Sequence, residues 1–143
     1  MHVAKIIDTK GASVITLRPT ASLAEAAHTL ARHKIGAVVV TDEEEMLVGI
    51  LSERDIVRAV AALGASALDA PLSAHMTANV QTTDPDEPIA SIMERMTQGR
   101  FRHIPVMQGK RIVGLVSIGD VVKFRVAMIE AEASAMRDYI ASA

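Results

Sequence analysis

The chain has 143 residues, of which half are apolar and only 2% aromatic, and its formal net charge is −2 at pH 7. This length fits one compact unit with an aliphatic core, and the charge gives no basic field that would attract nucleic acid or an anionic membrane. The absence of cysteine excludes disulfides and cysteine zinc sites, and it is compatible with the cytoplasmic location that we expect.

The first residues hold no long apolar run, so we expect no signal peptide. Apolar stretches such as 35–40 fall far short of the roughly 18 residues that a membrane span needs. The mean hydropathy of +0.27 is nevertheless high for a soluble chain. We therefore expect a homodimer that buries apolar surface between its subunits.

The first half of the chain reads as a strand, a helix, two strands and a helix. Residues 14–19 form an extended segment that ends at a proline, which disfavours helix in the residue before it. A helix and two apolar strands, over 36–40 and 46–51, come next, and a second helix is predicted after Ser52. The apolar positions with helical spacing in the first helix are Leu23, Ala26, Ala27 and Leu30.

The same order returns after a linker of small residues over 65–71. An extended segment at 80–85 is followed by a helix, by strands over 101–107 and 111–116, and by a helix after Ser117. The apolar positions of the first of these helices are Ile89, Ile92, Met93 and Met96. The pattern predicts an α+β fold built from two β-α-β-β-α repeats.

Direct alignment of the two halves supports the repeat. The prolines at 19 and 85 are 66 residues apart, and the glycines at 49 and 114 are 65 apart. The one-residue difference falls in a predicted hairpin turn, where length changes are tolerated.

The final helix is predicted to run from Ile118 to about Ile140, without proline and without glycine after Gly119. Its apolar stripe has two interpretations: it packs on its own subunit, or it reaches a partner. The residues of this stripe are Phe124, Met128, Ala131 and Ala135.

The most specific signal is a motif that occurs twice at the end of a predicted strand. Residues 49–55 read Gly-Ile-Leu-Ser-Glu-Arg-Asp, and residues 114–120 read Gly-Leu-Val-Ser-Ile-Gly-Asp. With the strands at 34–40 and 100–106, these motifs resemble the CBS-domain family over residues 10–125, in particular stand-alone proteins with two CBS domains.

The resemblance implies two copies packed about a pseudo-twofold axis, to which the sequence pattern adds an extended C-terminal helix. The expected boundaries are 8–64 for the first repeat, 73–125 for the second and 126–143 for the helical extension. It also implies a regulatory module that binds AMP, ADP, ATP or NAD(H) and modulates a partner protein that the sequence does not name.

The motif has a physical rationale of its own. Ser52 and Ser117 lie where a strand meets a helix N-terminus, a natural seat for a phosphate. Asp55 and Asp120 could accept hydrogen bonds from two ribose hydroxyls, and the aliphatic strands could hold an adenine. Alternatively, these four residues are helix caps, which is compatible with ligand contact.

Four further residues complete the predicted site. The resemblance puts Thr16 and Thr82 beside the base or ribose, although both are also ordinary strand threonines. It also implies that Arg102 and His103 reach phosphates near the middle of the module. Alternatively, Arg102 pairs with the acids at 84–87 and His103 is a half-buried structural residue.

No catalytic role is predicted. The chain has no Gly-x-Ser-x-Gly motif, no P-loop and no convergent set of histidine and carboxylate ligands, so we expect neither an enzyme nor a metal site. Arg102 and His103 align with Gly36 and Ala37. This difference between the repeats predicts one strong nucleotide site and a second that is weak or empty, without assigning either aspartate to the strong one. The alternative function is a protein-interaction module that binds no ligand.

Overall fold

The computed structural model describes residues 1–11 and 13–142. Residue 12 of the predicted first repeat and residue 143 of the predicted extension lie outside the described residues. The elements are α1 (Val3–Lys10), β1 (Thr16–Leu17), α2 (Leu23–His33), β2 (Ala37–Thr41), β3 (Leu47–Ser52), α3 (Glu53–Leu63), η1 (Gly64–Asp69), η2 (Leu72–Ala74), α4 (Ile89–Gly99), β4 (His103–Gln108), β5 (Arg111–Ser117) and α5 (Ile118–Ser142). This order confirms the predicted α+β class with a long C-terminal helix.

The first repeat is a three-stranded sheet with helices packed on it. β1 pairs parallel to β2, and β2 pairs antiparallel to β3. All five residues of β2 are buried. The N-terminus of α2 is fixed by the Ser22 side chain, which accepts a hydrogen bond from the backbone of Glu25. The main core residues here are Leu23, Ala26, Leu30, Val38, Val40 and Leu51.

The second repeat has the same hairpin and helices but a shorter first strand than predicted. β4 and β5 pair antiparallel, and residues 80–85 contribute only a single parallel bridge between Thr83 and Val106. Thr83 donates to the carbonyl of Pro105 at 3.0 Å and accepts from Met107 at 2.8 Å. The pairing cannot extend to Pro85, because proline has no backbone N–H to donate.

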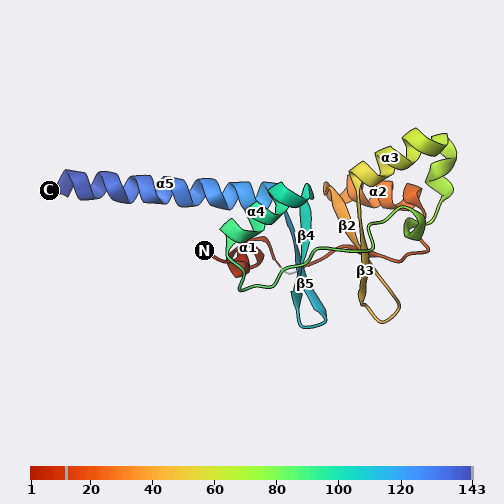
Figure 1. Cartoon of the computed structure of the whole chain (residues 1–143), viewed down its shortest axis with the longest axis horizontal. Helices are drawn as coiled ribbons and strands as arrows, with labels where there is room; N and C mark the ends of the chain where they lie inside the picture. The colour runs from red at the N-terminus through yellow and green to blue at the C-terminus, as the bar shows by residue number, and fades with distance from the viewer. Residues whose placement is uncertain (12, 143) are drawn as a thin grey trace.

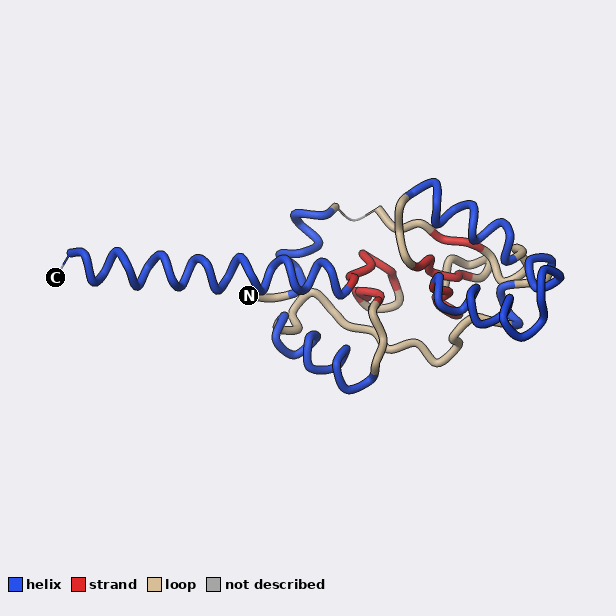
Figure 2. Tube along the Cα trace, turned by 90° about the horizontal axis from the view of Figure 1, so that it is seen from above, coloured by secondary structure: helices blue, strands red, loops and turns tan. Residues whose placement is uncertain are grey.

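Each core is completed by the segment that precedes the other repeat. α1, which was not among the predicted elements, buries Val3 and Ile6 against the second repeat, beside Ile92. Leu72, which directly follows the linker at 65–71, lies in the core of the first repeat. Figure 1 shows α1 beside α4, and Figure 2 shows the two strand regions lying between helices of both halves. The two repeats therefore interlock, and neither core is complete within its own segment.

α5 begins in the core and then leaves the body of the protein (Figure 1). Of the predicted apolar stripe, Phe124 and Met128 are half-buried, whereas Ala131 and Ala135 are exposed. The intrasubunit interpretation thus holds only for the first part of the helix. Among the described residues, no helix is both long and apolar enough to span a membrane.

Candidate functional site

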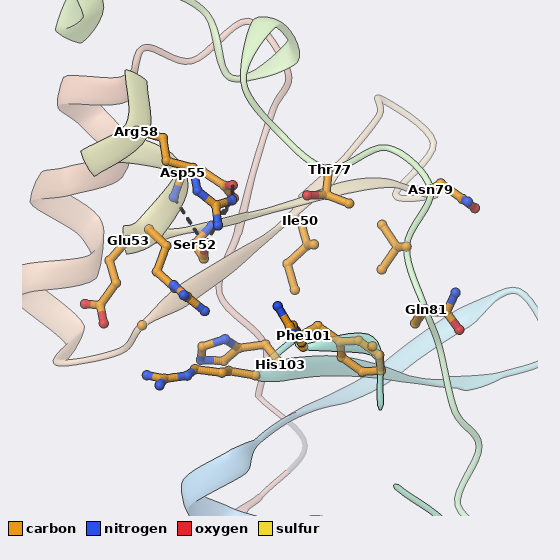
Figure 3. Close-up of a pocket in the computed structure, with 16 residues that line it drawn as sticks. Ile50, Ser52, Glu53, Asp55, Arg58, Thr77, Asn79, Gln81, Phe101 and His103 are labelled. Carbon is orange, nitrogen blue, oxygen red and sulfur yellow. Dashed lines mark hydrogen bonds and ion pairs between the residues drawn. The ribbon is translucent and has the colours of Figure 1, made fainter. Parts of the chain in front are cut away.

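A cavity of about 330 Å³ lies between the two repeats. Residues from 50–58 of the first repeat form one side, residues from 99–103 of the second form the other, and the connecting segment 77–81 forms a third wall (Figure 3). The volume is within the range of small-molecule sites. Four of the eight predicted site residues line this cavity: Ser52, Asp55, Arg102 and His103.

The Ser52–Asp55 motif forms a capping box at the junction of β3 and α3. The Asp55 backbone N–H donates to Ser52 Oγ at 3.3 Å, and Asp55 Oδ2 accepts from the Ser52 backbone at 2.9 Å. The predicted capping role is therefore confirmed. Asp55 Oδ1 is 3.9 Å from Arg58 Nη1 and is not part of the capping box. One carboxylate oxygen thus fixes the helix, while the other can accept hydrogen bonds from a ligand.

The opposite side of the cavity is the turn between α4 and β4. α4 ends at Gly99, and the capping residue Arg100, which has a left-handed backbone (φ 55°), leads the chain into Phe101 and His103. The repeats are in close contact here, because a Cβ on Gly36 would lie only 3.1 Å from His103 Nε2. Figure 3 shows Phe101 and His103 across the cavity from Ser52 and Asp55.

One of the acidic residues predicted as alternative partners of Arg102 is engaged elsewhere. Within the acidic segment 84–87, Glu87 Oε1 accepts from Arg95 Nη1 at 2.7 Å. Arg102 is instead an exposed residue of the cavity lining. Its guanidinium can therefore contact a ligand.

The charge of the cavity is opposite to that of the chain. Two carboxylates, Glu53 and Asp55, line it together with four arginines, although the whole chain has a net charge of −2. A concave site with an excess of guanidinium groups attracts anions, and guanidinium binds phosphate through charge-assisted hydrogen bonds. The four arginines are Arg54, Arg58, Arg100 and Arg102.

The imidazole of His103 is held towards its neutral form. Burial, and next the positive charge of Lys10, lower its pKa from the usual 6.5, whereas Glu53 and Asp120 act in the opposite direction. A neutral ring beside four arginines adds no further charge repulsion to the site. A phosphate bound nearby would favour the protonated ring.

This pKa shift predicts a pH dependence of stability. The folded pKa lies below the unfolded one, so the unfolded chain binds more protons and the free energy of unfolding falls as pH drops through about 6.5. His103→Gln should remove this contribution, which cannot exceed about 1.4 kcal/mol per pH unit for one proton. Denaturant unfolding of both proteins between about pH 7.5 and 5.5 measures the difference in slope.

The exposed His28 of α2 offers the matched control. His28→Gln should retain the parent slope. Equal slopes for the parent chain and His103→Gln would contradict the shift.

The second copy of the motif is closed by α1. Ser117 and Asp120 form the same reciprocal hydrogen bonds as the first motif, at 2.9 and 3.1 Å. In addition, Lys10 Nζ donates to Asp120 Oδ2 at 2.7 Å and to the carbonyl of Leu115 at 2.8 Å. Burial alone would raise the pKa of Asp120, but the hydrogen bonds from Lys10 and Ser117 outweigh it and the pKa is lowered. The two aspartates therefore differ in their environment.

The two predicted threonines do not line the central cavity. Thr16 lies at a different hollow near the hairpin tips, with Thr41 and Lys110. Thr82 is half-buried, and its carbonyl accepts a hydrogen bond from Arg95 Nη2 at 2.8 Å. Neither threonine is therefore among the residues that line the cavity with Asp55 and His103.

The cavity also includes residues that the sequence prediction omitted. Arg54 and Arg58 flank Asp55 on the first turns of α3, and Phe101 precedes the predicted basic pair. The sequence contained a signal for these residues. Arginines lie close to both predicted segments, and Phe101, one of the two phenylalanines of the chain, directly precedes the second. Among residues 1–11 and 13–142, no group of three or more His, Cys, Asp or Glu side chains is placed to hold a metal ion.

Comparison with known proteins places both repeats in one family. The model of the CBS domain matches residues 3–62 and 72–127. The crystal structure of a CBS-domain containing protein from Agrobacterium tumefaciens is 49% identical, with a TM-score of 0.85, over 87% of this chain and 92% of that one. The chain is also 35% identical over 120 residues to the mitochondrial CBS domain-containing protein CBSX3 from Arabidopsis thaliana, which corresponds to 81% of this chain and 58% of that protein.

Two further similar structures contain ligands. A CBS domain protein from Pyrobaculum aerophilum complexed with AMP is 27% identical, with a TM-score of 0.79, over 93% of this chain and 99% of that one. The CBS domain pair of protein MJ0100, in complex with 5′-methylthioadenosine and S-adenosyl-L-methionine, is 28% identical, with a TM-score of 0.79, over 90% and 98%. From the two matched repeats and these similarities, the chain belongs to the CBS-domain family, as a tandem CBS pair with a long C-terminal helix.

Proposed function

We propose that the chain is a regulatory module that binds one adenine nucleotide, AMP in the first instance, in the cavity beside Asp55. The observation that carries this proposal is the set of four arginines in a cavity of a chain with negative net charge. Such a site fits a phosphate-bearing ligand. Ligand-bound relatives with AMP or adenosine derivatives support the class of ligand.

Each part of a nucleotide has a counterpart in the cavity. Asp55 Oδ1 accepts hydrogen bonds from the ribose hydroxyls, while Oδ2 remains in the capping box. The phosphate lies towards the N-terminus of α3, where Arg54 adds to the positive end of the helix dipole. The adenine occupies the apolar part of the cavity, beside Phe101 and Ile50.

The arginines also distinguish between the two kinds of ligand found in relatives. S-adenosyl-L-methionine carries a positive sulfonium, which the excess of guanidinium groups disfavours, and 5′-methylthioadenosine has no phosphate for them to bind. AMP carries a phosphate that these guanidinium groups can bind directly. ADP, ATP and NAD(H) carry the same adenosine and phosphate, so they are the appropriate competitors in a binding experiment.

Calorimetric titration of the purified chain with AMP and with adenosine tests the proposal. We expect AMP to bind more tightly than adenosine, and Arg102→Ala to weaken AMP binding by about tenfold, since the side chain is exposed and screened. Adenosine binding should hardly change in this variant, because adenosine has no phosphate. Lys110→Ala, which removes a cation at a different hollow, is the control.

Two outcomes would contradict the nucleotide proposal. Equal losses of AMP and adenosine affinity in Arg102→Ala would show that Arg102 does not act through the phosphate. Absence of heat with AMP, ADP, ATP, NAD⁺ and NADH alike would favour the alternative, a protein-interaction module that binds no ligand.

We also propose that the module works as a homodimer that transmits nucleotide binding to a partner protein, without catalysis. Val57 of α3 and Val122 of α5 occupy equivalent positions in the two repeats, and both are exposed. Two equivalent apolar faces fit a symmetric interface between copies. Light scattering that reports a monomer at tens of micromolar would contradict the homodimer.

A further inference from the structure

The part of α5 beyond the body of the protein has no packing partner within the chain. Every described residue from Ile129 to Ser142 is exposed, and Figure 1 shows this segment extending away from both repeats. Isolated helices of about this length are marginal in water, even when they are rich in alanine. A stable helix here therefore needs a contact that a single copy does not provide.

An unbroken heptad pattern runs along the exposed face of α5. Six residues follow one another at spacings of four and three, which places them on one stripe of the helix. The five larger side chains are between 44% and 67% exposed. We call this stripe the α5 seam: Val122, Val126, Ile129, Ala133, Met136 and Ile140. The predicted stripe of Phe124 and Met128 lies on a different face, which packs towards the core.

We infer that the α5 seam pairs with the α5 seam of a second copy as a parallel two-stranded coiled coil. In heptad notation Val126, Ala133 and Ile140 are a positions, and Ile129 and Met136 are d positions. A small residue at Ala133 lets the two helices approach closely. This inference concerns α5 alone, so its failure would not contradict the nucleotide site proposed above.

The charged residues beside the seam select the parallel orientation. In a parallel pair, a g residue lies near the e residue of the next heptad of the other helix. Arg125 then faces the partner's Glu130, and Glu132 faces the partner's Arg137. Both contacts are between opposite charges, and each occurs twice in the dimer.

An antiparallel pair with the same overlap would bring like charges together. There, e residues face e residues and g residues face g residues, so Glu130 would lie near the partner's Glu130 and Glu132 near the partner's Glu132. Lys123 would lie near the partner's Arg137. Exposed ion pairs add little affinity, but like charges in opposition determine which orientation forms.

Cysteine cross-linking tests the seam directly, because the natural chain contains no cysteine. In a parallel pair Met136 lies against the partner's Met136, so the full chain carrying Met136→Cys should form an intersubunit disulfide when oxidised with diamide. Ala131→Cys, on the outer face of the same helix, should remain reduced. A dimer held through another surface gives no preference for position 136 over 131.

A second substitution distinguishes pairing through the α5 seam from cross-linking by random collision of two chains. Ile129→Glu in the Met136→Cys chain should cause loss of the cross-linked band, whereas Ala131→Glu in the same chain should leave it. An equal yield for Met136→Cys and Ala131→Cys would overturn the inference. So would a mixture of Val126→Cys and Met136→Cys chains that cross-links mainly between the two positions, which is the antiparallel result.

Discussion

Asp55→Ala is expected to weaken AMP binding by about ten- to hundredfold, whereas Asp120→Ala leaves it almost unchanged. A hydrogen bond to a charged group contributes about 1.5–3 kcal/mol, and Asp55 offers one carboxylate oxygen to the ribose from a side chain that is only 14% exposed. Asp120 is already paired with Lys10. Calorimetric titration of the three proteins with AMP measures the difference.

Asp120→Ala is a matched control because both aspartates hold the same capping box. Each accepts from the backbone of its serine at 2.9 Å, so each variant should lose about 0.5–2 kcal/mol of stability from its helix N-terminus. Asp120→Ala also removes the ion pair with Lys10, so its melting temperature should fall at least as far as that of Asp55→Ala, while its AMP affinity stays close to that of the parent chain. Equal losses of affinity in the two variants would contradict the assignment to Asp55 alone, and a loss confined to Asp120→Ala would assign the nucleotide to the other motif.

Local sequence patterns were sufficient for most secondary structure. The hairpin strands were predicted to within about two residues, and the helices after Ser52 and Ser117 begin where the serines indicated. The reason is that strand alternation, proline and helix caps act over a few residues. The repeat strengthened these predictions, because each element was interpreted twice.

α1 was missed although its apolar residues have helical spacing. Val3, Ile6 and Ile7 lie on one face, but an eight-residue helix shows too few turns for periodicity to stand out. Such a helix is not stable on its own. Its stability depends on the core of the second repeat, which lies about 90 residues further along the chain.

The candidate site also depends on contacts between residues that are far apart in the sequence. The sequence indicated that the motifs are symmetric and the basic pair is not, but the assignment of Arg102 to Asp55 depends on how the repeats pack. The contact between Lys10 and Asp120 joins residues 110 positions apart. No local pattern encodes it, so the closed second motif could only be found in the structure.

Lys10 is also the reason to expect a single nucleotide site in each chain. Its ammonium takes two acceptors at the second motif, the Asp120 carboxylate and the carbonyl of Leu115. At the first motif the equivalent carbonyl, that of Ile50, accepts from the backbone of Thr77 at 2.9 Å. Within residues 1–11 and 13–142, the cation paired with Asp55 is Arg58, at 3.9 Å, and no lysine is paired with it. A nucleotide that entered the second site would first have to displace Lys10 from Asp120.

Lys10→Met should therefore open a second, weaker site. The substitution keeps the length of the side chain and removes the ion pair, so second-site affinity should rise by about tenfold, a value kept low because Lys10 is 42% exposed. The new site should stay weaker than the first, because Gly36 and Gly119 stand where the first site has Arg102 and Arg54. Calorimetry should show the AMP stoichiometry rising from one towards two.

Lys5→Met, on the exposed side of α1, makes the same change in charge without touching Asp120 and should behave as the parent chain. Adding Asp120→Ala to Lys10→Met should remove the second site again, since the ribose would lose its acceptor. A Lys10→Met chain that binds AMP more weakly than the parent would instead show that Lys10 is a phosphate ligand. One that retains a single site of unchanged affinity would show that α1 closes the second motif through its apolar contacts, such as Ile7 against Gly114, rather than through the ion pair.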